Sequence, residues 1–365
     1  MQSYNCFRSP NFMNSAQGAS WNGSPWNHST PLNETCWMSD SMSTCVVAVY
    51  CLLIGLGLLG NGCLVAIIVA QRDRANVTSI LIANLSVSDI LVCLFCLPFT
   101  VVYTLMDQWV FGPMLCHLLP YVQCVSVNVS ILSLTLIALE RQQLILHPGG
   151  WKPTVVQAHV GVLLVWLLAC LSSLPFLVFQ SLMEDQHTEF QLCVECWPSE
   201  SARRAYTTTL LLLQYCVPLL LIMVCYARVF LRLRRPQTSQ RQRNRRRITV
   251  MLVALVMAFA LCWLPLNAFN LVADWKPMAL STCHHDLLFS LCHLLAMCST
   301  IVNPVIYGLL NRNFRQEMLG ILLHCRWAAA RGHCEHVPLA TINTELSRTS
   351  LHSVSVFPFS THIAQ

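Results

Sequence analysis

The stretch "LSLTLIALERQQLILHP" (residues 132–148) begins as an apolar run suited to lipid and then places Glu140 beside Arg141. A charged side chain in a membrane-spanning helix is costly, roughly 2.5–3.5 kcal/mol near the helix centre on insertion scales, and usually functional. The plain alternative is an arginine that extends to the membrane surface and anchors the helix. Because that alternative does not explain the adjacent acid, the stretch predicts a membrane-spanning helix that ends in a functional Glu-Arg pair.

The whole chain shares this apolar character. Of its 365 residues, 55% are hydrophobic and only 10% are charged, whereas soluble domains carry about 25% charged residues. We therefore predict an all-α membrane protein, a seven-transmembrane helix bundle over residues 45–310 with a short amphipathic eighth helix over residues 311–325. Each predicted span has the roughly 20 residues needed to cross a bilayer: 45–70, 79–103, 116–139, 155–179, 206–226, 248–273 and 287–310.

The segments on either side of the bundle are polar. Residues 1–44 lack the basic-then-apolar pattern of a cleaved signal peptide, and we predict a disordered outer tail glycosylated at the sequons of Asn22, Asn27 and Asn33. Apolar residues at helical spacing in 311–325 predict a helix on the inner leaflet, with Cys325 as a candidate for palmitoylation. Residues 326–365 predict a cytoplasmic tail open to phosphorylation.

The distribution of charge predicts the orientation of the bundle. With the N-terminus outside, the inner segments hold 18 basic and five acidic residues, a net +13, and the outer segments hold four basic and ten acidic residues, a net −6. Cytoplasmic segments of membrane proteins carry such an excess of Lys and Arg. We therefore predict a multi-pass plasma-membrane protein with an extracellular N-terminus. The arginine-rich run at 228–247 is then an inner connection that attracts anionic lipid, and it is not expected to bind nucleic acid.

Several spans contain polar residues or prolines that lipid disfavours. Asp89 is the costliest and must face the bundle interior. It either holds helices together through a hydrogen bond with Asn61 or Asn303, or joins Ser130 and Asn303 in a site for a sodium ion, and the sequence leaves both interpretations open. No other cofactor is expected.

Prolines in three spans predict bends, because each removes a helix hydrogen bond. They are Pro218, Pro265 and Pro304. Pro265 closely follows Trp263 in "CWLP" (262–265), and a large ring beside a bend can have two discrete packings. This pattern predicts a sixth span that moves when Trp263 repacks.

These features occur in a fixed order along the chain. Asn61, Asp89, Glu140-Arg141, Trp166, Pro218, "CWLP" and "NPVIY" (303–307) each stand in the matching span of a rhodopsin-like G-protein-coupled receptor, which the chain resembles from residue 45 to about residue 325. A narrower resemblance is to the neuropeptide Y receptor family, most of all its pancreatic polypeptide (type 4) branch. It rests on "RANVTSILIANLSVSD" (74–89), "VVYTLMDQWVFG" (101–112), "GWKP" (150–153), "TTLLLLQYCVPL" (208–219), "CWLPLNAFN" (262–270) and "CHLLAMCSTIVNPVIYG" (292–308).

The resemblance implies a ligand and the residues that bind it. The family's ligands are neuropeptide Y, peptide YY and pancreatic polypeptide, which end in an amidated tyrosine preceded by arginines. Asp274 matches the residue that pairs with a ligand arginine, and Asn270 matches one that binds arginine or the terminal amide. The other site positions would reach the tyrosine amide or form aromatic walls: Gln123, Gln214, His293, Tyr103 and Phe289.

Each of these residues also has a plainer interpretation. Asp274 could be a solvated loop charge, the polar residues could be satisfied interhelical groups, and the aromatic ones could be membrane-interface anchors. Gln123, however, stands where amine receptors carry an aspartate, which argues against an amine ligand. The net charge of −6 on the outer segments would attract a cationic peptide.

The resemblance also implies a disulfide and a mechanism of activation. Cys116 matches the cysteine that bonds the second outer loop, where Cys193 and Cys196 compete for it; whether Cys36 bonds Cys283 is also open. At rest Arg141 would pair with Glu140. When a ligand repacks the helices around Trp263, Arg141 would be released toward a G protein of the Gi/o class, which lowers cAMP. Arg141 would then meet two further side chains, Tyr226 and Tyr307.

Other classes of protein fit the sequence less well. The chain has no Gly-rich phosphate-binding loop and no metal-ligand spacing, so we do not expect an enzyme. A transporter would show inverted repeats around a midplane site, and none is visible. A receptor of the same fold for a different peptide remains the main alternative. Arrestin is a further expected partner, together with membrane lipid.

Overall fold

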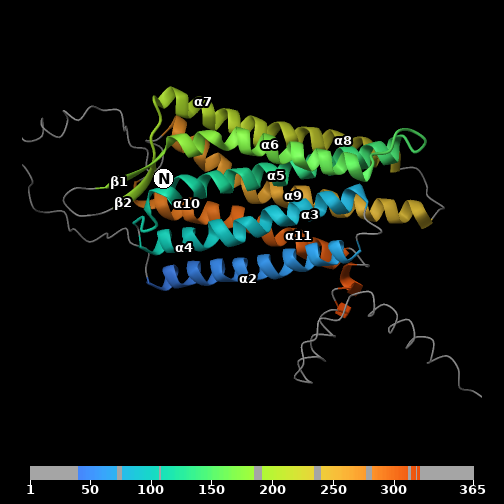
Figure 1. Ribbon diagram of the computed structural model, residues 1–365, viewed down its shortest axis with the longest axis horizontal. Coiled ribbons are helices and arrows are strands. Elements are labelled where there is room, and N and C mark those ends of the chain that lie inside the picture. The colour runs from blue at the N-terminus through green and yellow to red at the C-terminus, as the bar shows by residue number, and fades with distance from the viewer. Residues whose placement is uncertain are drawn as a thin grey trace, which may run out of the picture.

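The computed structural model describes residues 40–71, 76–106, 108–184, 191–233, 240–276, 282–310, 314–317 and 319–320. Within these ranges seven helical segments are long and apolar enough to cross a membrane, and Figure 1 shows them side by side in one bundle. Four spans are single helices: α2 (Asp40–Ala70), α5 (Gly112–Leu146), α6 (Val155–Phe179) and α9 (Gln240–Trp275). The second span comprises α3 (Val77–Leu91), η2 (Val92–Cys96) and α4 (Leu97–Met106). The fifth span comprises α7 (Glu200–Leu210), η3 (Leu211–Cys216) and α8 (Val217–Leu233). The seventh span comprises α10 (Thr282–Met297) and α11 (Ser299–Leu310).

All seven predicted spans are confirmed, and most helices extend beyond the apolar run that predicted them. Local chemistry explains where several begin. Pro113 lies in the first turn of α5, where its missing N–H would have no helical partner anyway. The Asn76 side chain accepts a hydrogen bond from the Ser79 N–H at the start of α3, and Thr154 and Gln157 form a reciprocal capping box at the start of α6.

A two-stranded antiparallel hairpin of β1 (Gln180–Glu184) and β2 (Gln191–Glu195) lies at one end of the bundle (Figure 1). We call this the hairpin end, and the opposite end, which carries Glu140 and Arg141, the Arg141 end. Cys193 of β2 is disulfide-bonded to Cys116 of α5, which decides between the two competing cysteines. Cys196 is disulfide-bonded as well. The hairpin was not predicted, because strand pairing depends on the disulfide and on neighbouring helices rather than on an apolar run.

Two apolar clusters form the core along the bundle. One joins side chains of α2, α3, α5, α8, α9 and α11 and includes Leu85, Ile137 and Leu255. The other joins α2, η2, α9 and α10 and includes Tyr50 and Leu266. Large apolar side chains on the outside of the helices are exposed, among them many of α6, as expected where lipid is the solvent.

The prolines are accommodated in different ways. Pro218 lies in the first turn of α8, directly after the π-helical turn η3. α9 continues through Pro265 and α11 through Pro304. Gly60 of α2 allows a close approach to Pro304, since a Cβ at residue 60 would lie 2.7 Å from the Pro304 ring.

The start of the predicted eighth helix is visible at the Arg141 end. Residues 314–317 and 319–320 are helical, and Phe314 is buried against Tyr307, with ring centroids 6.5 Å apart. Arg315 and Gln316 are exposed, so this segment is amphipathic. The predicted modification sites lie outside the described residues: Asn22, Asn27, Asn33 and Cys325.

Candidate functional site

Three polar side chains from three helices form a hydrogen-bonded chain near the hairpin end. The Tyr50 hydroxyl of α2 lies 3.0 Å from Nδ1 of His293 in α10, and Nε2 of Gln123 in α5 lies 3.0 Å from Nε2 of the same ring. A neutral imidazole has one donor and one acceptor nitrogen. The Gln123 amide therefore donates to Nε2, and Nδ1–H donates to the Tyr50 oxygen. His293 is only 4% exposed, so this chain is a buried and uncharged polar element.

An aromatic side chain extends this group. Phe289 stacks on His293 at 5.8 Å between ring centroids and contacts Phe269 of α9 at 5.7 Å. The structure thus brings three of the predicted site residues into direct contact: Gln123, His293 and Phe289. Tyr103 lies in a different cluster, edge-on to Trp109 at 5.6 Å and beside the disulfide.

Asp274 lies in the last turn of α9 and is not a solvated loop charge. Its Oδ1 is 3.1 Å from Nε of Arg203 in α7, and the two side chains are 16% and 11% exposed. The neighbouring Arg204 donates from Nε to the backbone carbonyl of Asp274 at 3.1 Å and also pairs with Glu200. The predicted ligand-binding acid therefore ties α9 to α7.

A second carboxylate lies near this ion pair. Glu195, the last residue of β2, accepts a hydrogen bond of 2.9 Å from the Trp197 indole N–H. Burial raises the pKa of the Glu195 carboxyl above its ordinary value, against smaller opposing effects of that hydrogen bond and of the Arg203 charge. Arg203 therefore pairs directly with Asp274, and its charge acts more weakly on the Glu195 carboxyl.

The two other predicted ligand-binding residues are not joined to these groups. Asn270 is exposed on α9. Gln214, in η3, donates to the backbone carbonyl of Cys124 at 3.5 Å, which is a long hydrogen bond. The structure brings neither into contact with His293 or Asp274 among the described contacts.

The middle of the bundle contains the buried Asp89. Its Oδ2 accepts a hydrogen bond of 2.6 Å from Nδ2 of Asn303 in α11. Asn61, the other expected partner, instead donates to two backbone carbonyls, those of residues 57 and 300. Ser130 is 2.8 Å from the Ser88 hydroxyl. Among the described side chains no three His, Cys, Asp or Glu residues gather as metal ligands.

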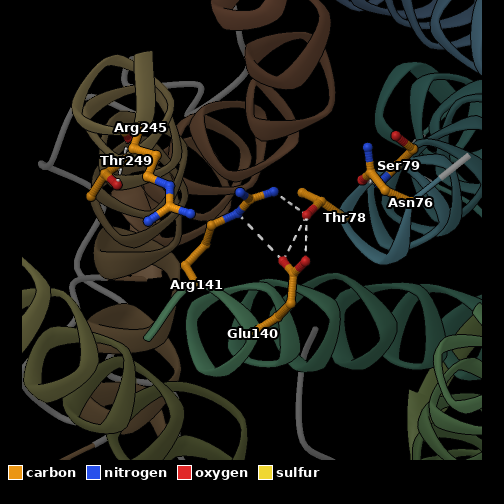
Figure 2. Close-up of polar contacts among 7 residues, drawn as sticks. All are labelled: Asn76, Thr78, Ser79, Glu140, Arg141, Arg245 and Thr249. Atoms are coloured by element: carbon orange, nitrogen blue, oxygen red, sulfur yellow. Dashed lines mark hydrogen bonds and ion pairs between the residues drawn. The ribbon is translucent and has the colours of Figure 1, made fainter. Parts of the chain in front are cut away.

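At the Arg141 end the Glu-Arg pair is held against a third residue, Thr78 of α3, as Figure 2 shows. Nε of Arg141 lies 3.3 Å from Oε2 of Glu140. The Thr78 hydroxyl lies 2.8 and 2.6 Å from the two Glu140 oxygens and donates to that carboxylate. It also accepts a hydrogen bond from Nη2 of Arg141. One hydroxyl therefore bridges both charges and links α5 to α3.

The α9 residues labelled in Figure 2 near Arg141 include no acidic side chain. Arg245 and Thr249 lie on the side of Arg141 away from Thr78 (Figure 2). The Thr249 hydroxyl donates to the Arg245 carbonyl of its own helix at 3.0 Å. α9 therefore presents a like charge to Arg141, and Thr78 is the interhelical hydrogen-bond partner that the structure shows for the pair.

Two buried tyrosines lie near Arg141. They are Tyr226 of α8 and Tyr307 of α11, and neither hydroxyl has a hydrogen-bond partner among the described residues. A buried polar group without a partner costs roughly 1–3 kcal/mol. Farther along the bundle, the Trp263 indole N–H donates to Ser299 at 3.2 Å and so links α9 to α11.

Sequence reasoning missed three residues that the structure places at these groups. Tyr50 carried a signal, since it is the only hydroxyl-bearing residue in the first predicted span. Arg203 was counted only as one of four outer basic residues. Thr78 stands at the edge of the second span and resembles any helix-end threonine, so nothing in the sequence distinguished it.

Comparison with known proteins agrees with this architecture. Residues 60–307 match the family described as 7 transmembrane receptor (rhodopsin family). The chain is 46% identical over 346 residues to neuropeptide Y receptor type 4-2 of Homo sapiens, covering 90% of this chain and 91% of the relative. It is 44% identical over 365 residues to neuropeptide Y receptor type 4 of Mus musculus, covering 94% and 96%. It is also 44% identical over 337 residues to neuropeptide Y receptor type 6 of Oryctolagus cuniculus, covering 87% and 91%.

Proposed function

Since the chain belongs to the rhodopsin family of seven-transmembrane receptors and, within it, to the neuropeptide Y receptors, we propose that it binds C-terminally amidated peptides of the neuropeptide Y, peptide YY and pancreatic polypeptide group. Membership alone makes it a multi-pass membrane receptor with a peptide ligand and a G-protein partner, and not an enzyme. What we propose beyond this membership is the identity of the peptides and of the residues that bind them.

The uncharged chain of Tyr50, His293 and Gln123 is the observation that supports the proposal most. A terminal carboxamide both donates and accepts hydrogen bonds and carries no charge, so it matches this chain. A free carboxylate would lose its hydration there without gaining a cationic partner, and an unpaired buried charge is strongly disfavoured. Phe289, stacked on His293, would contact the ring of the terminal tyrosine.

Asp274 would bind an arginine of the peptide. A carboxylate and a guanidinium form two parallel hydrogen bonds, which gives both strength and orientation. Asn270 is exposed on the same helix, Gln214 is in η3 and Tyr103 is in α4. We assign these three to supporting contacts.

Release of Arg141 at the opposite end would produce the signal. In the resting arrangement Thr78 and Glu140 hold Arg141, while the buried hydroxyls of Tyr226 and Tyr307 lack described partners. An outward movement of α9, made possible by Trp263 and Pro265, would let the guanidinium turn to these hydroxyls and to a G protein of the Gi/o class. This is a two-state element that a ligand biases by binding one state better. Asn303 and Pro304 would adjust with α11. Lower cAMP and later recruitment of arrestin would follow.

Asp89 is proposed to hold a sodium ion that stabilises the resting state. Asp89, Ser130 and Asn61 would supply oxygen ligands, since the Asn61 carbonyl has no hydrogen-bond partner among the described residues and hard cations prefer oxygen. Sodium should lower peptide affinity in the wild type, and Asp89→Asn should abolish the difference between sodium and N-methylglucamine buffers. Equal sodium sensitivity in Asp89→Asn would contradict this site.

The excess of basic residues at the Arg141 end supports an extracellular N-terminus in the plasma membrane. With this orientation the sequons of Asn22, Asn27 and Asn33 would be glycosylated, and Cys325 would lie where palmitoylation occurs. Digestion of surface receptor with a glycosidase, and acyl exchange compared with Cys325→Ser, would test these assignments.

The deciding experiment is a displacement assay on cells that express the receptor. Amidated pancreatic polypeptide, neuropeptide Y and peptide YY should bind, and their free-acid forms should bind at least about tenfold more weakly, because about 1.4 kcal/mol corresponds to a tenfold change in affinity. In Gln123→Leu the ratio between amide and acid should shrink. Equal binding of the two forms, or no specific binding of any of these peptides, would contradict the proposal and favour a receptor for a different peptide.

A further inference from the structure

The ion pair between Arg203 and Asp274 places an arginine of the receptor where the proposed ligand needs to place its own. Arg203 comes from the second turn of α7, and Asp274 from the last turn of α9, so the two are 71 positions apart in the sequence but 3.1 Å apart between Nε and Oδ1. Both side chains are mostly buried, at 11% and 16% exposed. The Asp274 carboxylate is therefore neutralised before any ligand arrives.

The geometry of the ion pair indicates that another cation can replace Arg203. Nε of Arg203 is buried, and despite the short distance its N–H makes no hydrogen bond among the described residues. The contact is thus a close charge pair with a misaligned donor, whereas an incoming guanidinium can align two N–H groups with both carboxylate oxygens. Exchange would replace a poorly aligned pair with a better one.

Arg203 also has a second acid to pair with after displacement. Glu195 at the end of β2 interacts electrostatically with both Arg203 and Asp274. A displaced guanidinium would turn toward Glu195 and favour the ionised form of its carboxyl. It would then not be left as a buried unpaired charge, which would be strongly destabilising.

We infer that Arg203 is an internal competitor for Asp274 and that a ligand arginine binds by taking its place. This inference rests on the proposed function, and it makes Arg203 a specificity-determining residue. A ligand gains from Asp274 only if its cation pairs better with the carboxylate than Arg203 does. Because lysine has no planar fork of donors, the competitor favours arginine-bearing peptides over lysine-bearing ones.

Arg203→Gln tests the inference, with Arg204→Gln as the matched control. Both variants remove one positive charge from adjacent residues of α7. Within the described part of the chain, however, Arg204 bonds the backbone carbonyl of Asp274 and the exposed Glu200, and not the Asp274 carboxylate. Arg203→Gln should bind the amidated, arginine-bearing peptide about fivefold more tightly than Arg204→Gln does, the range expected for removing a partly exposed competing pair. The gain should disappear in an Asp274→Asn background and with a peptide whose C-terminal arginines are replaced by citrulline, which is uncharged.

The possible outcomes separate this inference from the proposed function. Absence of peptide binding by the wild type would overturn both. Binding by the wild type, with no gain in Arg203→Gln over Arg204→Gln at equal surface expression, would overturn the inference alone, as would a gain that persists in Asp274→Asn. If Arg203→Gln fails to reach the surface, Arg203→Lys should show a smaller gain of the same sign, and unchanged or weaker affinity there would overturn the inference.

Discussion

Replacing Thr78 with valine should activate the receptor without any peptide. Valine has nearly the shape of threonine but no hydroxyl, so Thr78→Val removes the group that accepts from Arg141 and donates to Glu140 while it keeps the packing of α3 (Figure 2). The ion pair between Glu140 and Arg141 remains, because both residues are on α5. What is lost is the link that holds the guanidinium against α3.

The size of the effect follows from which bonds change between the two states. The bond from Thr78 to Glu140 can survive in the active state, whereas the bond from Arg141 cannot, so only the latter biases the equilibrium. A hydrogen bond to a charged group contributes roughly 1.5–3 kcal/mol, and we take the lower value because the Arg141 side chain is 17% exposed. About 1.4 kcal/mol is a tenfold change. A resting population that is ~1% active should therefore become about 10% active.

Basal nucleotide exchange on a co-expressed G protein measures this population directly. Membranes are assayed without peptide, and the rate is divided by the number of receptors at the surface. Thr78→Ser keeps the hydroxyl and should match the wild type. Ser79→Ala deletes a hydroxyl one position along and should also match it, since Ser79 contributes its backbone N–H to the Asn76 cap. If Thr78→Val has the basal rate of Thr78→Ser, the hydroxyl does not restrain Arg141 and the reasoning is wrong.

Four further substitutions test other parts of the structure. Asp274→Ala should weaken an arginine-bearing amidated peptide by about tenfold, and unchanged affinity at normal surface expression would remove Asp274 from the site. Arg141→Ala should keep peptide affinity but lose ligand-stimulated nucleotide exchange, so full signalling would refute its role. Cys116→Ser should abolish peptide binding at the cell surface, and normal binding would make the bond to β2 dispensable. Because burial raises the pKa of Glu195, the folded receptor should lose stability as the pH rises from the ordinary carboxyl range through that raised pKa. Glu195→Gln should remove this part of the pH dependence of the unfolding temperature. A variant with the same pH profile as the wild type would contradict this prediction.

The seven spans could be predicted from the sequence because few backbone structures are stable in lipid. An apolar run of about 20 residues can satisfy its backbone in a bilayer only as a helix, so each run predicts its own structure without reference to the others. The contact of Glu140 with Arg141 was equally accessible, since the two residues are adjacent on one helix. The basic residues likewise predicted an orientation by their position alone.

The partners of the polar side chains depended on the tertiary structure. Asp89 bonds Asn303 and not Asn61, Cys116 bonds Cys193, and Asp274 pairs with a residue of its own chain. Each of these contacts joins separate segments, and its formation depends on how far each helix is rotated and shifted against its neighbours. A span with apolar residues on all of its faces does not show in the sequence which face contacts a neighbouring helix, so the sequence does not reveal that rotation.

The amino-acid sequence by itself thus determined the seven helices, their family and the charged pair at the end of the third span. The packing of the helices decided that Thr78 restrains this pair and that Arg203 already occupies Asp274. The physical reason is range: burial in lipid acts on each segment separately, whereas a hydrogen bond or an ion pair forms only when two distant segments come within about 3 Å of each other.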